Sequence, residues 1–347
     1  MNIAIETSPL SGPHGRRGIG WYTNNLILAL NKYENKHSYV LFNRTEKLPN
    51  NIDIIHYPFF DPFFLTLPPT HNKRSVVTIH DLIPLLYPDK IKPGIKGGLI
   101  WHIQKRKARN YGAIITDSGT SRKDIMEIIR VPSEKVHVVH LAAGEEFQII
   151  NDKRALIKIV KKYNLNKFLM YVGDVNFNKN IHSLMQSFQK VSHDYPDLDL
   201  ALVGDGFLGS SREARDIDVL ISNLELTHKV KRLGFVPTED LVGLYNCAKV
   251  YIQPSFYEGF GLPVLEAMAC GCTVVASRGG SLSEIMGETG ITIDPENIGS
   301  IRDGIVKALE LNTVERKELV NRELLQASRF SWRETAKQTV KVYESLL

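Results

Sequence analysis

Two glutamates, Glu258 and Glu266, stand eight positions apart around a glycine-rich turn that leads into an apolar helical pattern. Pro263 suits the first turn of a helix because its missing N–H has no intrahelical partner there, and Gly271 suits the end. The amides of residues 260–262 would then lie at a helix N-terminus, which favours a bound phosphate. Because carboxylates repel phosphate, we expect them to bind sugar or ribose hydroxyls. The pattern predicts a sugar-nucleotide site; for isolated glutamates, dipole partners and solvated charges are an equal alternative.

The segment from Glu258 to Gly271 resembles the E-x7-E motif of retaining glycosyltransferases of family four, which have the GT-B fold. The resemblance also covers segments on both sides, namely 233–237, 244–248, 253–255, 274–277 and 284–285. It implies an α/β protein made of two facing Rossmann-like domains with an interdomain cleft. It also implies that the cleft binds a nucleotide-diphosphate sugar.

The resemblance assigns roles to residues of the second half. Glu266 would accept hydrogen bonds from the ribose, and Glu258 would accept them from the transferred sugar as a catalytic residue. Main-chain groups around Val236 would contact the nucleobase. The residues assigned to donor binding in this half are Asn178, Val236, Phe260, Gly261, Leu262 and Glu266.

Lys179 lies in a segment where family members place an arginine and a lysine that bind the donor diphosphate. Lys179 matches that lysine, and we expect it to be catalytic because it would stabilise the departing diphosphate. Asn178 stands where the arginine is often found, so one positive charge is missing. Asn178 would still donate a hydrogen bond, and Arg122 or Arg16 would compensate for the charge.

The first half contains a glycine loop between a strand pattern and a helix pattern. Gly18 and Gly20 match the family's Gly-Ile-Gly-x-Tyr-Thr loop, which implies that they bind the donor and that the Gly18 amide faces its phosphate and sugar. Arg16 and Arg17 in the same loop would bind an acidic acceptor. Solvated loop charges explain these two arginines equally well.

His80 follows the strand pattern of residues 75–79 and begins a His-Asp-Leu sequence similar to that of the family. A lone histidine is more often structural, but this position at the end of a strand favours a functional role. The resemblance implies that His80 is catalytic and hydrogen bonds to the transferred sugar. Ser118 and Ser121 are interpreted mainly as helix caps.

Short apolar runs alternate with helical patterns along the chain, which is typical of doubly wound parallel α/β folds. The predicted strands are 3–6, 39–42, 52–56, 75–79, 113–116, 136–139, 168–172, 198–203, 230–233, 250–253 and 273–276. Helices are predicted at 21–30, 89–110, 120–129 and 331–347. The predicted domains are an N-terminal acceptor domain at 1–150, a C-terminal donor domain at 151–330, and a helix at 331–347 that returns to the first.

Composition narrows the functional class. The 347 residues include no apolar run near the roughly 20 residues that cross a bilayer, and the start is not signal-like. We therefore expect a cytoplasmic protein. The three cysteines suit neither a disulfide framework nor zinc. The two Asp-x-Asp triplets, 197–199 and 216–218, are interpreted as solvated charges, so no metal is expected.

The net charge of +5 arises in the first half, where residues 1–150 carry 19 Lys and Arg against 13 Asp and Glu. Residues 96–109 combine several of these basic residues with apolar ones. Such a helix suits peripheral contact with the inner face of an anionic membrane, or guidance of an anionic acceptor. A solvated basic face is an equal alternative. Nucleic-acid binding is not expected because no recognised module accompanies the charges.

The resemblance thus implies a retaining, metal-independent glycosyltransferase without a cofactor. It would move a hexose, with mannose favoured, from GDP-mannose or a UDP-sugar to a glycan or lipid-linked glycan in polysaccharide or lipopolysaccharide biosynthesis. A sugar-nucleotide 2-epimerase of the same fold would use the donor without an acceptor. A non-catalytic sugar-nucleotide-binding protein is the other alternative, since the missing arginine is consistent with it.

Overall fold

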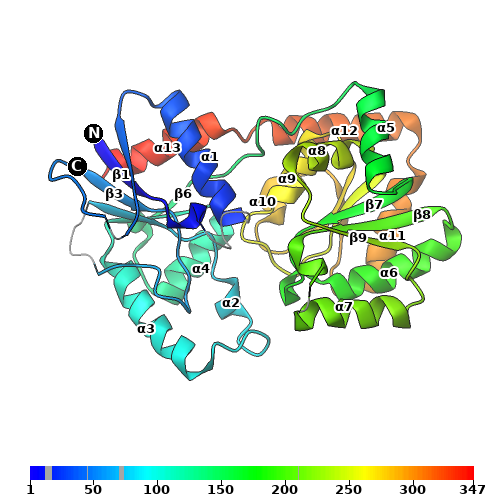
Figure 1. Ribbon diagram of the computed structural model, residues 1–347, viewed down its shortest axis with the longest axis horizontal. Coiled ribbons are helices and arrows are strands. Elements are labelled where there is room, and N and C mark those ends of the chain that lie inside the picture. Colours follow the sequence, from blue (N-terminus) through cyan, green and yellow to red (C-terminus); the bar gives the residue numbers. More distant parts are fainter. Residues whose placement is uncertain (12–17, 45, 70–73, 210) are drawn as a thin grey trace. The chain divides into compact units, whose positions relative to one another are not determined.

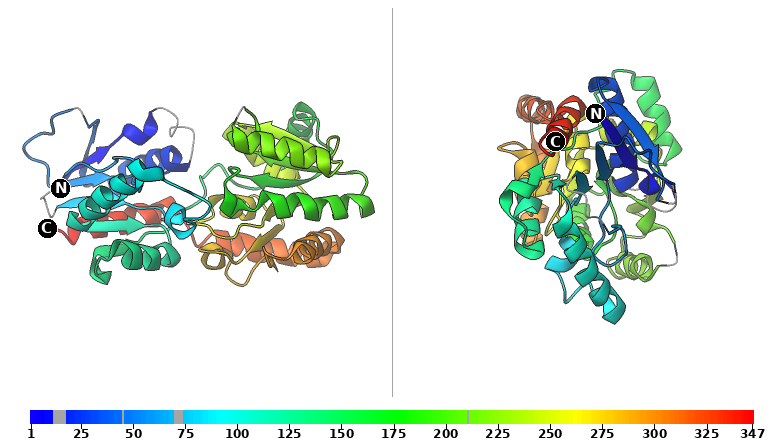
Figure 2. Two further views of the ribbon diagram at one scale, coloured as in Figure 1. Left: turned by 90° about the horizontal axis from the view of Figure 1, so that it is seen from below. Right: turned by 90° about the vertical axis from the view of Figure 1, so that its left-hand side faces the viewer.

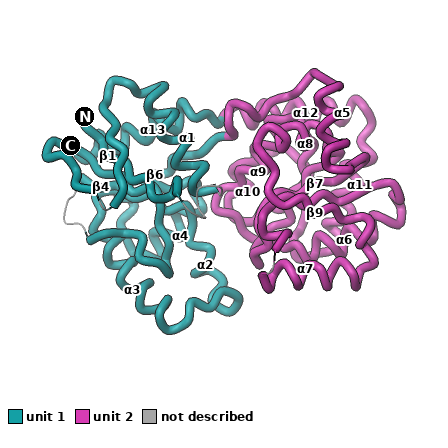
Figure 3. Tube along the Cα trace, viewed as in Figure 1, with its two compact units in different colours: residues 1–142, 330–347 teal, residues 143–329 magenta. Residues whose placement is uncertain are grey.

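The computed structural model describes residues 1–11, 18–44, 46–69, 74–209 and 211–347. The chain forms two compact units, drawn in separate colours in Figure 3. Unit 1 consists of Met1–Ala142 and Phe330–Leu347, and unit 2 consists of Ala143–Arg329. The C-terminal segment therefore belongs to the same unit as the N-terminus. The first helix of unit 2 begins at Lys153, with Asp152 as its N-cap.

The core of unit 1 is a six-stranded parallel sheet with the order β2-β1-β3-β4-β5-β6 (Figure 1). Its strands are β1 (Asn2–Glu6), β2 (Ser38–Phe42), β3 (Ile54–Tyr57), β4 (Ser75–Thr78), β5 (Ala113–Thr116) and β6 (Val136–Val138). The strands β4 and β5 are completely buried, because helices cover both faces of the sheet.

Two pairs of helices enclose this sheet (Figure 1). Helices α1 (Gly18–Tyr33) and α13 (Trp332–Glu344) pack together on one face, whereas α3 (Gly94–Asn110) and α4 (Gly119–Ile129) lie on the other. A short helix, α2 (Ile83–Leu86), precedes α3. The hydroxyl of Tyr343 on α13 lies 2.7 Å from Nδ1 of the buried His56 on β3, so the last helix is anchored in the first unit's core.

Unit 2 repeats this architecture with the strand order β12-β11-β10-β7-β8-β9, again entirely parallel. Its strands are β7 (Lys167–Val172), β8 (Leu198–Val203), β9 (Val230–Gly234), β10 (Val250–Gln253), β11 (Val274–Ser277) and β12 (Ile291–Ile293). Because each crossover contains a helix, every strand has its carboxyl end at the same edge of the sheet.

The helices of unit 2 also form two layers (Figures 1 and 2). One face carries α6 (Ile181–Asp194), α7 (Arg212–Asn223) and α11 (Ile298–Glu310). The other carries α5 (Lys153–Lys162), α8 (Thr238–Cys247), α9 (Leu262–Ala269) and α12 (Thr313–Ala327), and α10 (Leu282–Met286) packs on α9 and α12. Apolar side chains of the strands meet apolar helix faces in one core, which includes Leu169, Phe188 and Ile252.

The predicted fold class, strand order along the chain and helical connections are confirmed, with local corrections. The helix predicted from residue 89 begins only at Gly94, where φ is +65° and the preceding residue is Pro93. Ser118 is the N-cap of α4 and accepts from the Ser121 amide, whereas Ser121 lies inside the helix and is not a cap. The edge strand β12 (Ile291–Ile293) was not predicted.

Candidate active site

The turn between β10 and α9 is shaped by the residues that the sequence singled out. Gly261 is the N-cap of α9 with φ +103°, and Pro263 follows in the first turn. A Cβ at Gly261 would lie 2.7 Å from Cδ2 of Leu282, so both backbone conformation and space require glycine. Pro263 has no N–H and the Val264 amide donates to the Gly261 carbonyl over 3.0 Å, so the amides that this helix start leaves without intrahelical acceptors are those of Gly261 and Leu262. The turn can therefore present N–H groups to an anion.

Glu258 lies in this turn and forms an ion pair with Lys179. The Lys179 Nζ atom is 2.9 Å from Oε1 and 2.7 Å from Oε2 of Glu258. The carboxylate is buried, and the ammonium is mostly buried. The structure thus brings together two of the three predicted catalytic residues, although they are 79 positions apart in the chain.

Two further residues hold the Glu258 carboxylate from behind. The Gln253 amide and the Ser255 hydroxyl donate to Oε1 of Glu258 over 2.7 and 2.6 Å. Tyr251 in turn donates to the Gln253 side-chain carbonyl. Tyr251 and Gln253 are two positions apart on β10, so their side chains lie on the same face of the sheet. The resemblance covers residues 253–255, but the role of Gln253 and Ser255 in holding Glu258 was not predicted.

The loop after β7 is attached to the Glu258 turn by asparagines. The Asn178 side-chain amide donates to the Tyr257 carbonyl over 2.9 Å, while the Asn178 carbonyl accepts from the Phe256 amide. Asn180, with φ +57°, donates to the carbonyls of Pro254 and Pro295. The Asn178 side chain is buried, and one of its two amide hydrogens is already used in the hydrogen bond to Tyr257. Its predicted contact with the donor stays a prediction.

Arg122, one of the two arginines expected to compensate for the missing positive charge, is hydrogen bonded to the main chain of unit 1. Its guanidinium donates to the Val136 and Ser133 carbonyls in unit 1, over 2.9 and 3.0 Å. Replacing the missing diphosphate-binding arginine would require Arg122 to break these hydrogen bonds. Arg16, the other candidate, and Arg17, the predicted acceptor residue, lie outside the described residues.

Glu266 lies on α9 and is buried. Its Oε2 atom accepts a 3.0 Å hydrogen bond from the Tyr245 hydroxyl on α8. Burial raises the pKa of Glu266 to about 7, the Tyr245 hydrogen bond opposes this shift, and the negative charge of Glu146 adds to it. Glu266 can therefore change its protonation state near neutral pH, which is notable for a group predicted to accept hydrogen bonds from ribose.

Val236 follows β9 and is buried, and its neighbour Phe235 is exposed. Pro237 then occupies the N-cap position of α8. This arrangement leaves the main chain between strand and helix at the carboxyl edge of the sheet, as the assigned role in base recognition needs.

His80 stands just after β4 in unit 1, and its ring is held by Asp117, which follows β5. The Nδ1 atom of His80 lies 2.7 Å from Oδ2 of Asp117, and the Tyr22 ring meets the imidazole edge-on at 4.6 Å. Burial lowers the pKa of His80, but the charge and hydrogen bond of Asp117 outweigh burial and raise it above the ordinary value. Nε2 has no hydrogen-bond partner among the described residues. The ring is thus fixed by Asp117, and its Nε2 atom is itself buried.

Gly18 and Gly20 lie in the first turn of α1. Gly18 is exposed, and a Cβ there would meet no atom within 4 Å. Local packing therefore does not require glycine at position 18. The absence of a side chain leaves the amide of Gly18 open to close approach, as its predicted donor contact needs.

Neither Asp-x-Asp triplet has the character of a metal site. Asp197 pairs with Lys167, and Asp218 pairs with Arg232. Asp216 lies 3.9 Å from Arg212 on the same helix. Within the described ranges, no group of three or more His, Cys, Asp or Glu residues is placed to hold a metal ion.

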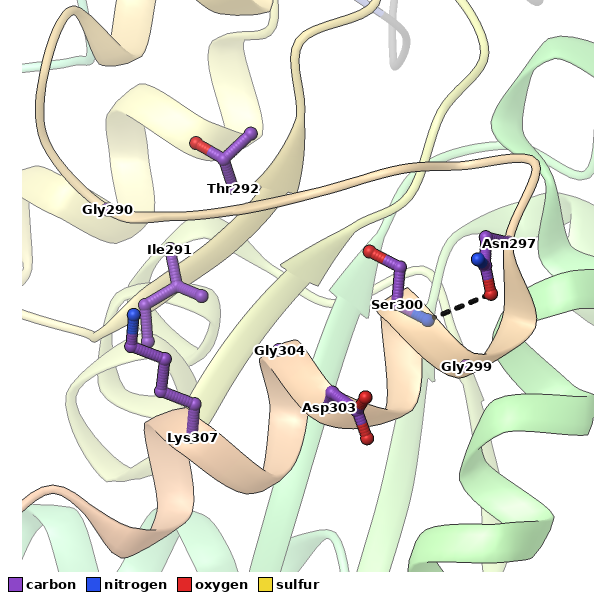
Figure 4. A pocket seen from close by; sticks show the side chains of 9 residues that line it. All are labelled: Gly290, Ile291, Thr292, Asn297, Gly299, Ser300, Asp303, Gly304 and Lys307. Carbon is purple, nitrogen blue, oxygen red and sulfur yellow. Dashed lines mark hydrogen bonds between the residues drawn. The ribbon is translucent and has the colours of Figure 1, made fainter.

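A polar hollow of 740 Å³ lies along β12 and α11, away from these residues (Figure 4). It is lined by Gly290, Ile291, Thr292, Asn297, Gly299, Ser300, Asp303, Gly304 and Lys307. The Asn297 side chain caps α11 by accepting from the Ser300 amide, and the Ser300 hydroxyl accepts from the Asp294 amide. None of the predicted site residues lines it.

Family models match both parts of the chain. Residues 152–327 match the model described as glycosyl transferases group 1, and residues 11–143 match the model described as glycosyltransferase family 4. The protein therefore belongs to the family-four glycosyltransferases of group 1. It is a glycosyltransferase of the GT-B type.

Named relatives include mannosyltransferases. O-antigen chain mannosyltransferase B of Escherichia coli is 31% identical over 307 residues, which cover 85% of this chain and 76% of that protein. Serotype-specific mannosyltransferase WbdA of Escherichia coli is 30% identical over 281 residues, which cover 79% of this chain but only 34% of WbdA. The chain thus corresponds to about one third of WbdA.

Among solved structures, HepE of Anabaena in complex with UDP-glucose has a TM-score of 0.76 at 18% sequence identity. The match covers 99% of this chain and 100% of HepE. At this level of identity the likeness concerns the fold alone. In the part of the chain that the structure describes, no helix is long and apolar enough to cross a membrane.

Proposed function

We propose that the protein is a retaining, metal-independent mannosyltransferase that transfers mannose from GDP-mannose to a growing glycan, free or lipid-linked. The observation that carries the proposal is the paired Lys179 and Glu258 beside the N-terminus of α9. This edge of one sheet combines a cation, helix amides and a carboxylate. The printed names of the relatives support mannose, since mannosyltransferase B and WbdA share about 30% of their matched residues with this chain.

The proposed reaction breaks the bond between the sugar's anomeric carbon and the donor diphosphate, so negative charge develops on the leaving phosphate. The Lys179 ammonium and the first amides of α9 would stabilise that charge, and they need no reorganisation because the fold already holds them. The phosphate would take the proton of the attacking acceptor hydroxyl on the same face, which gives retention. His80 would hydrogen bond to the transferred sugar, and Glu258 would accept from its hydroxyls.

A UDP-sugar is the second donor in this proposal, because HepE, which shares the fold, has been solved with UDP-glucose. Base choice would depend on main-chain groups around Val236. We propose that the reaction takes place in the cytoplasm at the inner face of the membrane, where a lipid-linked acceptor would be accessible.

A panel of GDP- and UDP-sugars tests the proposal. The protein is incubated with each donor, with and without mannose-containing acceptors, and products are identified by mass spectrometry. We expect an acceptor-dependent mass gain with GDP-mannose, which persists with a metal chelator, and NMR should show an α-linkage. An isomerised donor without acceptor would indicate an epimerase, and binding without any product would indicate a binding protein. Either result contradicts the proposal.

A further inference from the structure

The outer face of α3 has an unusual combination of charges. The helix contains five basic residues and no acidic residue, the basic ones being Lys96, Lys105, Arg106, Lys107 and Arg109. Lys107 and Arg109 donate to the main-chain carbonyls of Leu67 and Ile129. Lys96 and Arg106 are exposed and form no ion pair with any described residue. Their positive charge is therefore directed to solvent.

Large apolar side chains share this outer face. Ile95, Leu99 and Ile103 are 89%, 63% and 46% exposed, and their four-residue spacing places them in one row. The opposite side of α3 packs on the unit 1 core through Gln104 and Ala108, which are fully buried. The exposed row is thus additional to the apolar face that the fold needs.

A neighbouring loop adds two further apolar side chains. Phe64 and Leu65 are 68% and 57% exposed. Their loop is fixed to α3, because the Gln104 amide donates to the Asp61 carbonyl and the Thr66 hydroxyl. Single exposed apolar residues are ordinary, but five on two attached segments mark an interaction surface.

We propose that the outer face of α3, formed by Ile95, Leu99, Ile103, Lys96 and Arg106, docks on an anionic lipid bilayer together with the 64–65 loop. The apolar row would enter the headgroup–acyl boundary, and the two cations would bind lipid phosphates beside it. The charged residues of α3 are all basic, so the helix complements an anionic bilayer, and it has no acidic residue to bind a basic partner. This inference rests on the proposed function, because docking on a bilayer would bring the protein to a lipid-linked acceptor.

The structure also specifies which residues of the basic segment do not take part. Trp101 is only partly exposed and packs against the core cluster of unit 1. Lys105 lies over its ring, 5.6 Å from the centroid. Trp101 therefore supports the helix from beneath.

Vesicle co-sedimentation tests the proposal with the full-length protein. Vesicles of phosphatidylethanolamine with phosphatidylglycerol should bind the protein at low salt, and phosphatidylcholine vesicles should bind it weakly. Leu99→Ser with Ile103→Ser should weaken partition about tenfold, because apolar area is lost. Lys96→Gln with Arg106→Gln should weaken it about fivefold for each charge removed. Val314→Ser with Leu325→Ser, two similarly exposed positions on α12, should leave it unchanged.

Equal binding to both kinds of vesicle, equal binding by all variants, or no vesicle binding by the wild-type protein would each overturn the docking surface. Because all substituted side chains are exposed, circular dichroism should show every variant folded. Transfer to a water-soluble acceptor, measured in parallel, separates the two proposals. Transfer without vesicle binding refutes docking alone, whereas vesicle binding without transfer refutes the proposed function alone.

Discussion

The two units use carboxylates in opposite ways at the carboxyl edges of their sheets. In unit 1, Asp117 holds the His80 ring through Nδ1, and the buried Nε2 atom has no hydrogen-bond partner among the described residues. In unit 2, Glu258 is itself held, with Lys179 contacting both of its oxygens and Gln253 behind it. One site contains a ring nitrogen without a partner, whereas the other contains two charged groups that satisfy each other.

Because of this difference, we expect ligand binding at the Lys179–Glu258 pair to cost free energy. A diphosphate that binds Lys179 must share or replace its contacts with Glu258. Gln253 and Ser255 still donate to Oε1 of the released carboxylate, so it is Oε2 that needs a new donor such as a sugar hydroxyl. Because a buried carboxylate without donors is unfavourable, the sugar and the diphosphate should bind best as one molecule. The His80 pair imposes no such requirement.

The largest effect is expected from Lys179→Ala. It removes the proposed diphosphate cation and leaves Glu258 buried without its charged partner. We expect donor kcat/KM to fall about 100-fold, with weaker binding and slower turnover. Calorimetry with GDP-mannose and initial-rate kinetics measure both. An unchanged nucleotide-sugar affinity would rule out the phosphate role of Lys179.

Glu258→Gln should act mainly on turnover. The amide keeps the size of the side chain but loses the charge that accepts strong hydrogen bonds, so kcat should fall about 30-fold while donor affinity changes little. Kinetics at saturating donor test this. An equal loss in affinity and turnover would show that Glu258 serves ground-state binding.

Asp117→Asn isolates the unit 1 pair. Without the negative charge of Asp117, the pKa of His80 should fall, so its titration moves to lower pH, and transfer should slow about tenfold at neutral pH. Histidine NMR titration and the pH profile of kcat provide the readouts. If the pKa of His80 is the same in Asp117→Asn as in the wild-type protein, Asp117 does not determine the charge of His80.

Ser255→Ala should have a smaller effect, because Gln253 and Lys179 still hold Glu258 after the hydroxyl is lost. We expect kcat to fall about threefold to tenfold, with donor KM nearly constant. Ser255→Thr, which keeps the hydroxyl, is the matched control and should recover activity. Failure of Thr to rescue would indicate a packing role.

The smallest expected effect is a pH dependence of stability, which arises from two buried carboxyls of unit 2 outside the Lys179–Glu258 ion pair. The pKa of Glu266 is raised to about 7 by burial, and that of Glu323 to about 8 by burial. Both folded values exceed the unfolded value, so both groups stabilise the fold at low pH, and this contribution is lost as pH rises from about 4.5 through 7 or 8. Thermal melts across this range should show the decline.

Variants of the same two carboxyls can separate an effect of pH on donor binding from its effect on stability. Donor affinity should rise as pH increases through about 7 if ionised Glu266 accepts the ribose hydroxyls. Glu266→Gln should flatten that dependence, whereas Glu323→Gln should flatten only the stability curve. A donor affinity that depends on pH identically in both variants would contradict the ribose role.

The sequence contained most of what shapes the Glu258 turn, because Gly261 and Pro263 act within a few positions of the chain. It also predicted the strands, since parallel strands covered on both faces are continuous apolar runs. The Lys179–Glu258 pair was not predictable in the same way. It exists because β10 pairs with β7 rather than with the strand before it in sequence, and local patterns do not encode which strands are neighbours.

The partner of His80 shows the same limit. Asp117 lay in a segment interpreted through its serines, because nothing local indicates that the residues after β4 and β5 meet. Roles that depend on resemblance, such as those of Gly18 and Val236, are compatible with their surroundings and stay predictions. The two arginines at 16 and 17 lie outside the described residues, so acceptor binding by them is also a prediction.

The insertion of unit 2 between two parts of unit 1 has a consequence for biosynthesis. During translation, residues 143–329 emerge as an uninterrupted stretch and can fold as soon as they leave the ribosome. The interior of the earlier unit is incomplete until Tyr343 is made, because the Tyr343 hydroxyl meets the buried His56 there. A ribosome that stalls before the final helix would therefore release a chain whose later-made half is complete and whose first-made half is not.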